Sequence, residues 1–434
     1  MAEGEAVRLS SVDILKGLTI VCIVLVHVVI RRGEGGGEMP LFMQALYLIL
    51  MVFFLISGYF YRPGKGFVYN MKKRVLQLGI AIVICSFVLT AIISVWLFIF
   101  GQSPEDPVYD YFEAVLRALN LTNLFEPVGE VLLSPISGAS IGYYYIWVML
   151  IAFIIFYGLA DHVMDDWYKI AATIIALLVI TCLMVEFVGV VLPFFAHLSP
   201  IAAAFMFMGA ALSKLKVVER IESFEFKSAR YWSLLIVSAV CLVVLLVLFH
   251  PGSGFDQLYF GSMGGLSAFV YFIQATLMFI ICLYVAALLS KVPGLTWFFS
   301  LFGRHTLGIL LLHGFFIKMM MVPFFQMTDE MWFPGGMSAV QMVLLAIGVF
   351  GACLLVCEYG PKIIGKLSRR DAVKGRSPCP CQEDVKDCFL SSILDYIFKT
   401  VVILTASVKY EDRKMLGITK KIGCNLCLKS NSFI

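Results

Sequence analysis

The chain has 434 residues, of which 61% are hydrophobic and only 14% are charged. Soluble domains are about 45–50% apolar and roughly 25% charged, so this composition excludes a soluble globular protein. The formal net charge is only +4, but residues 358–434 hold 14 Lys and Arg against 8 Asp and Glu, so the basic excess lies in the tail. A basic tail beside a bilayer is typical of a cytoplasmic segment near anionic lipid, and we expect no nucleic-acid partner.

Apolar runs of near membrane-spanning length, separated by charged or Pro/Gly-rich breaks, divide most of the chain. The predicted helices lie at 14–30, 41–61, 75–100, 141–160, 169–191, 199–213, 231–249, 264–289, 305–322 and 338–357. The sequence therefore predicts an all-α fold, a polytopic transmembrane bundle of about ten helices over residues 1–360. A basic, cysteine-containing cytoplasmic tail is expected over residues 361–434.

The breaks between these helices predict the orientation of the chain. Lys and Arg cluster at 62–74 and 214–230, whereas 101–140 and 323–337 are mainly acidic. Because Lys and Arg are retained on the cytoplasmic side, the first two breaks should be cytoplasmic and the other two should face outward. An even number of spans then places both termini in the cytoplasm. Segment 101–140 is long enough to be an acceptor-binding loop, with an ordinary surface loop as the alternative.

Seven of the 12 cysteines lie in or at the ends of apolar runs, where cysteine packs as a small hydrophobic residue and should remain a free thiol. In the tail, Cys379 and Cys381 form a close pair, and Cys424 and Cys427 form another. One residue separates the first pair instead of two, which does not fit usual zinc spacing. We expect no metal site.

The first predicted helix carries Lys16 and His27 in an apolar run. Eleven positions separate them, so they differ by roughly 20° around the helix axis and by ~16 Å along it. Ionisable groups at membrane depth are candidates for function, and this shared stripe suits a substrate that enters with its anionic end first. The alternative is that Lys16 snorkels to the interface and His27 marks the outer end of the helix.

Two further motifs carry polar residues near the membrane. The second predicted helix ends in Phe-Phe-Leu-Ile-Ser-Gly-Tyr, residues 53–59, and the basic cluster Lys72, Lys73 and Arg74 follows. The small Ser-Gly pair permits close helix approach, and the cluster either neutralises phosphates or anchors the chain on the cytoplasmic side. Near the ninth helix, residues 303–313 read Gly-Arg-His-Thr-Leu-Gly-Ile-Leu-Leu-Leu-His, with Arg304 near its start and His313 inside the membrane. The remaining histidines fall in loops or at helix ends, and we assign no site to them.

Together these motifs resemble the acyltransferase-3 family of integral-membrane O-acyltransferases. The resemblance lies in the Asp-x-x-Lys-Gly start at Asp13 with His27 behind it, in residues 53–59, and in residues 303–313, and it extends over roughly residues 8–357. It implies about ten helices and transfer of an acyl group, usually acetyl, from cytoplasmic acyl-coenzyme A to a sugar hydroxyl. The Asp-x-x-Lys-Gly form is similar to the branch that acetylates exopolysaccharide sugars.

The resemblance implies that His27 is catalytic, and we expect His313 to assist it. Acetyl-coenzyme A is the expected donor, with its phosphates near Lys72, Lys73, Arg74 and Arg304 and its acyl arm passing Lys16. The expected partners are this donor, a glycan or lipid-linked sugar and the lipids of a cell membrane, of the bacterial inner or plasma membrane type. A neutral His27 imidazole could take the proton of the acceptor hydroxyl, or it could carry the acyl group covalently.

A transporter or flippase of a polar lipid or saccharide is the competing class. The few charges inside the membrane and the lack of a matched pair of broken helices count against it. A membrane module for sensing or anchoring is a third interpretation.

Overall fold

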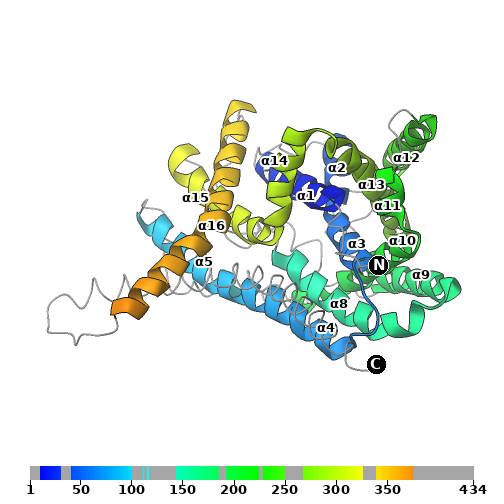
Figure 1. Ribbon diagram of the computed structural model, residues 1–434, viewed down its shortest axis with the longest axis horizontal. Coiled ribbons are helices and arrows are strands. Elements are labelled where there is room, and N and C mark those ends of the chain that lie inside the picture. Colours follow the sequence, from blue (N-terminus) through cyan, green and yellow to red (C-terminus); the bar gives the residue numbers. More distant parts are fainter. Residues whose placement is uncertain are drawn as a thin grey trace, which may run out of the picture. The chain divides into compact units, whose positions relative to one another are not determined.

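A computed structural model of the chain describes residues 10–30, 41–99, 111, 115–116, 143–184, 192–223, 228–249, 267–325 and 339–374. Within these ranges the regular elements are all helical (Figure 1). In chain order they are α1 (Ser10–Ile30), α2 (Leu41–Leu48), η1 (Ile49–Met51), α3 (Val52–Tyr59), α4 (Phe67–Arg74), η2 (Val75–Gly79), α5 (Ile80–Ile99), α8 (Tyr143–Val163), α9 (Trp167–Leu183), η5 (Pro193–Leu198), α10 (Ser199–Lys214), α11 (Val217–Ser223), α12 (Ala229–Leu248), α13 (Ser267–Leu289), α14 (Pro293–Arg304), α15 (Thr306–Phe325) and α16 (Ala339–Lys374).

Seven helices in the described ranges are long and apolar enough to cross a membrane. An eighth candidate is the pair α14 and α15, which meet at an angle of 79°. Two shorter apolar helices, Ala45–Tyr59 and Trp167–Leu183, fall in the remaining two predicted segments. The prediction of an all-helical, multi-pass membrane protein is thereby confirmed, while the cytoplasmic location of both termini stays a prediction.

The chain forms two compact units, Met1–Gly351 and Ala352–Ile434. The boundary falls inside α16, and the structure describes the second unit only as far as residue 374. Every residue discussed below as part of a site belongs to the first unit.

Hydrogen bonds between connecting segments link the ends of α3, α8 and α10 at one end of the bundle. Tyr61 after α3 donates a hydrogen bond to Asp161 near the end of α8, with 2.6 Å between the oxygen atoms. Lys214 at the end of α10 donates to the carbonyl of Met164 just beyond α8. We call this the basic end of the bundle, defined by residues 60–74 and 214–223, because it brings together the basic residues that the sequence predicts to be cytoplasmic.

Glycines let α1 and α14 approach to backbone contact. A Cβ atom on Gly17 would overlap the carbonyl group of Phe299, and one on Gly303 would overlap that of Asp13. The two helices lie side by side in Figure 1. Small residues allow such close packing between membrane helices, where van der Waals contact and not the hydrophobic effect drives association. The Asp-x-x-Lys-Gly motif at residues 13–17 and the motif at residues 303–313 therefore meet through their glycines.

A second glycine pair joins α3 to α10. A Cβ on Gly58 would overlap the backbone of Met206, and one on Gly209 would overlap that of Leu55. The close helix approach predicted for the Ser-Gly pair of the second segment is confirmed, and α10 is its partner.

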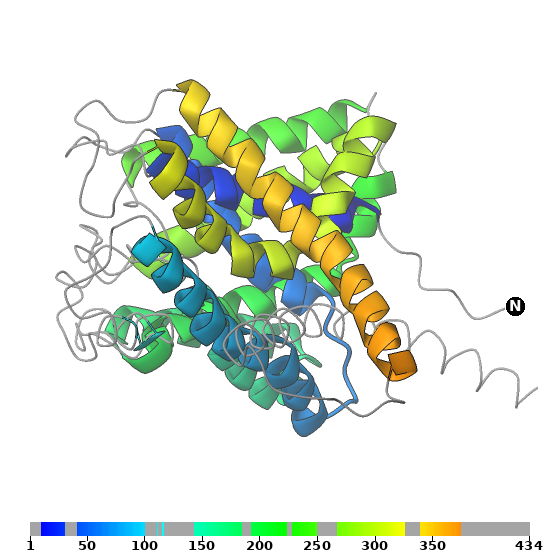
Figure 2. The ribbon, with the colours of Figure 1, turned by 90° about the vertical axis from the view of Figure 1, so that its left-hand side faces the viewer.

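Helices α4 and α5 form one continuous helical segment through η2, as Figure 2 shows. η2 is a π turn that follows Arg74 directly. A π turn adds one residue to the helix, which rotates the side chains before it by about 100° relative to those after it. The side-chain directions of the basic residues in α4 therefore cannot be obtained by extending the 3.6-residue period of α5 backwards.

The segment before α10 has an unusual backbone. Phe194 (φ 57°, ψ 22°) and Phe195 (φ 55°, ψ 37°) are both left-handed. Bulky residues rarely adopt this conformation, and each stores ~1–3 kcal/mol of strain.

The cysteines of the described helices, among them Cys22, Cys85 and Cys282, are free thiols, as their apolar context predicts. The predicted acceptor loop 101–140 lies outside the described residues except for Tyr111, Val115 and Leu116. The tail cysteines also lie outside them.

Candidate functional site: a histidine pair between α1 and α15

Two histidines that are far apart in the sequence meet inside the bundle. The ring centroids of His27 in α1 and His313 in α15 are 5.0 Å apart, and their planes are tilted by 60°. The two helices pack against each other directly. The structure thus brings together the two residues that the sequence nominated for chemistry.

The hydrogen bonds of both rings define which nitrogen carries the proton. His27 Nδ1 lies 2.8 Å from the carbonyl oxygen of Ile23, and His313 Nδ1 lies 2.8 Å from that of Leu310. A carbonyl oxygen only accepts hydrogen bonds, so each Nδ1 must carry hydrogen and donate. In the neutral ring Nε2 then holds a lone pair. Both imidazoles are thereby oriented as proton acceptors through Nε2.

The two rings differ in burial. His313 is fully buried, and its Nε2 has no hydrogen-bond partner among the residues the structure describes. His27 is half-buried. A buried acceptor without a partner is unfavourable by about 1–3 kcal/mol, and such groups in a fold point to a functional requirement. The pair therefore consists of one enclosed base and one that is more accessible.

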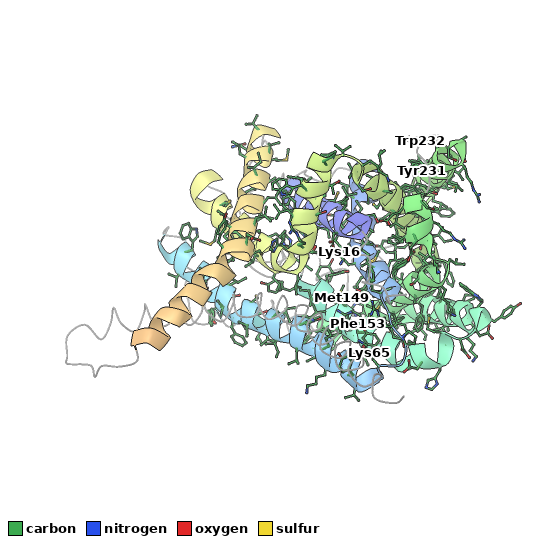
Figure 3. All side chains as sticks on the ribbon, viewed as in Figure 1. Lys16, Lys65, Met149, Phe153, Tyr231 and Trp232 are labelled. Atoms are coloured by element: carbon green, nitrogen blue, oxygen red, sulfur yellow. The ribbon has the colours of Figure 1, made fainter. Side chains whose placement is uncertain are left out.

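Lys16 lies beside Phe60 of the basic end, on the same helix as His27. It is labelled in Figure 3. Since α1 is continuous from Ser10 to Ile30, the expected geometry holds: both side chains share one stripe, ~16 Å apart along the axis. The Lys16 Nζ atom lies 5.8 Å from the ring centroid of Phe60, at the end of α3. This cation–π contact holds the charge beside the end of the Ser-Gly-Tyr-Phe motif.

The short helix α11 joins the ends of the two helices next to Lys16. Tyr59 donates a hydrogen bond to Glu219, with 2.5 Å between the oxygens, and Ser11 donates to Glu222 through both its backbone N–H and its hydroxyl. The glutamates thus tie the start of α1 and the end of α3 to one element. Sequence inspection missed them, because segment 214–230 stands out for its basic residues.

Arg74 is held in place by aromatic side chains of α8. Its guanidinium lies 4.7 Å from the ring centroid of Phe153, and its Nε donates to the hydroxyl of Tyr157 at 3.3 Å. The ring of Tyr61 packs against Tyr157 as well. Burial, followed by the hydrogen bond to Asp161, raises the pKa of Tyr61, so this phenol stays protonated as a donor. A stacked, planar guanidinium is preorganised to bind phosphate through its remaining N–H groups.

The other cationic residues are less constrained. Lys72 is exposed and Lys73 is half-buried, both on α4, which packs against α8. Arg304 is exposed at the end of α14, and its Nε donates to the carbonyl of Ser300 in the same helix. The predicted coenzyme contacts therefore lie on two separate helices. Lys72, Lys73 and Arg74 are on α4, which packs against α8, and Arg304 is on α14, which packs against α1.

Of the four histidines that the sequence assigns to loops or helix ends, the structure describes three. His162 is exposed in the last turn of α8, and His305 is buried at the joint between α14 and α15. His197 is buried in η5. His250 lies outside the described residues.

The fold and this site define a multi-pass helical membrane protein with a pair of proton-accepting imidazoles inside its bundle. A family model described as an acyltransferase domain matches residues 9–358. The chain therefore belongs to the acyltransferase 3 family and is a membrane acyltransferase. No curated protein and no solved structure matches it.

Proposed function

We propose that the protein transfers an acyl group, specifically acetyl, from acyl-coenzyme A to a hydroxyl of an extracytoplasmic or lipid-linked glycan, with His27 as the general base. The observation that carries this proposal is the histidine pair, in which both Nδ1 atoms donate to carbonyls of their own helix, so that Nε2 is the basic nitrogen of each neutral ring. Acyl transfer to a hydroxyl needs such a base, because the neutral hydroxyl is a weak nucleophile.

In the proposed reaction the acceptor oxygen attacks the thioester carbonyl while its proton passes to Nε2 of His27. A new C–O bond forms, the C–S bond breaks, and the proton then moves from the imidazolium to the departing coenzyme thiolate. His313, 5.0 Å away between ring centroids, shares the positive charge that develops on the pair. Its Nε2 can accept a hydrogen bond from protonated His27 or from the acceptor hydroxyl.

The donor site is supported by the cations of the basic end. Arg74 is fixed on Phe153 and binds phosphate, while Lys72 and Lys73 of α4 and Arg304 at the end of α14 add positive charge. Lys16, beside Phe60 at this end, shares one stripe of α1 with His27 and guides the acyl arm inward. Charge concentrated at one end favours entry of an anionic donor from that end.

The test is acceptor-dependent release of free coenzyme A from acetyl-coenzyme A by the purified full-length protein in lipid nanodiscs. We expect stoichiometric transfer of labelled acetyl to a polysaccharide acceptor and an equal amount of free thiol. A transporter or flippase would release no thiol, and an enzyme with another donor would leave acetyl-coenzyme A intact. Either result would overturn the proposed donor and reaction.

A further inference from the structure

An aromatic cluster lies near the end of α8 that is opposite the basic end. It consists of Tyr144 and Trp147 from α8 and of Phe194 and Phe195 from η5. The ring centroids of Trp147 and Phe194 are 4.6 Å apart, and those of Tyr144 and Phe195 are 5.5 Å apart. Along α8, Trp147 lies ~24 Å from Val163 and ~9 Å from Phe153, which Arg74 contacts.

One polar atom in this cluster has no partner. The indole Nε1 of Trp147 is buried without a hydrogen-bond partner among the described residues. An indole N–H is a donor that usually finds an acceptor when it is buried. Phe194 covers the indole, and Phe194 is also one of the two left-handed residues of the structure's strained turn. Strained backbone of this kind is found at ligand clamps and switch regions.

Helix α8, which carries part of the cluster, also contacts the helix of His313. Tyr143 donates a hydrogen bond to the carbonyl of Leu311 at 3.0 Å, and the neighbouring carbonyl of Leu310 accepts from His313. Trp147 is one helical turn from Tyr143, rotated by about 40°. The aromatic cluster and His313 are therefore linked through the first two turns of α8.

We propose that Trp147, with Tyr144 and Phe195, forms a binding site for a saccharide ring of the acceptor, and that Phe194 is its cover. The proposal rests on the proposed function, because it assigns the acceptor of that reaction a place in the bundle. A pyranose presents a face of C–H groups that packs on an aromatic ring and hydroxyl oxygens that accept from an indole N–H. In this structure the ring of Phe194 lies against the indole, with the two ring planes tilted by 38°. Its movement exposes the indole and releases the left-handed strain.

This arrangement predicts opposite effects of two substitutions. Trp147→Leu removes both the ring and the N–H donor, and we expect it to weaken saccharide binding by about tenfold or more. Phe194→Gly removes the cover and places glycine where φ is positive, which glycine adopts without strain. It should therefore tighten saccharide binding by about threefold to tenfold.

The experiment is a titration followed by saturation-transfer difference NMR, with the full-length protein in detergent and no acyl donor present. The probes are three neutral hexasaccharides: maltohexaose, cellohexaose and chitohexaose. Trp232→Leu is the matched control, because this exposed tryptophan belongs to α12 and lies far from the labelled α8 residues Met149 and Phe153 in Figure 3. We expect the wild type and Trp232→Leu to bind one of the probes equally well.

Equal binding by Trp147→Leu and the wild type, weaker binding by Phe194→Gly, or binding of none of the three probes by the wild type would each overturn the proposal. These outcomes leave the proposed reaction standing, because the coenzyme A release assay measures the reaction independently. Conversely, saccharide binding without acetyl transfer would support this site and contradict the proposed function.

Discussion

The chemistry of His27 and His313 depends on two backbone hydrogen bonds. Each Nδ1 donates to a carbonyl three or four residues earlier in its own helix, so the helix itself selects the tautomer. No carboxylate is needed to orient either ring. This arrangement fits an apolar membrane interior, where a buried carboxylate would be unfavourable.

Replacement of His313 by Phe removes the buried Nε2 and keeps an aromatic ring of similar size. We expect kcat to fall by at least about tenfold, because the charge on His27 loses its neighbouring acceptor. KM for acetyl-coenzyme A should stay unchanged. Steady-state kinetics with His162→Phe as the control checks this, since His162 is exposed at the end of α8. A wild-type kcat in His313→Phe would remove His313 from the mechanism.

Arg74 offers a second test at the scale of single residues. Arg74→Lys keeps the charge but loses the planar group that stacks on Phe153 and donates to Tyr157. We expect KM for acetyl-coenzyme A to rise by about tenfold with little change in kcat, because lysine binds phosphate as a point charge. The measurement is KM against kcat for Arg74→Lys and for Lys65→Arg, whose exposed cation contacts Tyr69. Equal effects of both substitutions would show that only net charge matters.

Among the helices, glycines and the short helix α11 determine which elements meet. Gly17 and Gly303 bring α1 and α14 into backbone contact, and Gly58 and Gly209 do the same for α3 and α10. Glu219 and Glu222 of α11 then tie the ends of α3 and α1 together. Lys16 and His27 are thus carried by a helix that is fixed on two sides.

Gly303→Ala should therefore destabilise the fold, since the added methyl overlaps the carbonyl of Asp13 in α1. The expected loss is about 1–3 kcal/mol, typical of overpacking. Gly294→Ala is the matched control in the same helix, because a Cβ there meets no atom within 4 Å. The measurement is the midpoint of thermal unfolding of each variant in detergent. Equal midpoints would mean that α1 and α14 are not packed through this glycine.

For the molecule as a whole, hydropathy predicted the helices well, because a membrane span must satisfy its backbone hydrogen bonds internally and must be long and apolar. The π turn after Arg74 and the left-handed turn at Phe194 escaped prediction, since both depend on packing with other helices. The sequence indicated His27 and His313, because ionisable groups are rare in membrane spans. It did not indicate Glu219 or Trp147, because their contacts with Tyr59 and Phe194 join residues that are distant in sequence.

The orientation of the bundle is a prediction at this scale. The basic end should face the cytoplasm, because Lys and Arg are retained there. A membrane-impermeant maleimide should label Lys65→Cys in inside-out vesicles and leave it unlabelled in intact cells. Leu192→Cys, just before η5 at the other end, should show the reverse pattern. The unmodified chain provides the background, and labelling of Lys65→Cys from outside would invert the predicted topology.

The most direct test of the central claim is single-turnover acetyl transfer by His27→Ala. The labelled acetyl-coenzyme A and the polysaccharide acceptor are saturating, and His162→Ala serves as the control. If His27 is the general base, transfer falls by about 100-fold or more in His27→Ala and stays at the wild-type rate in His162→Ala. An undiminished rate in His27→Ala, with the variant folded as judged by its unfolding midpoint, would contradict the assignment of the histidine pair as the site of acyl transfer.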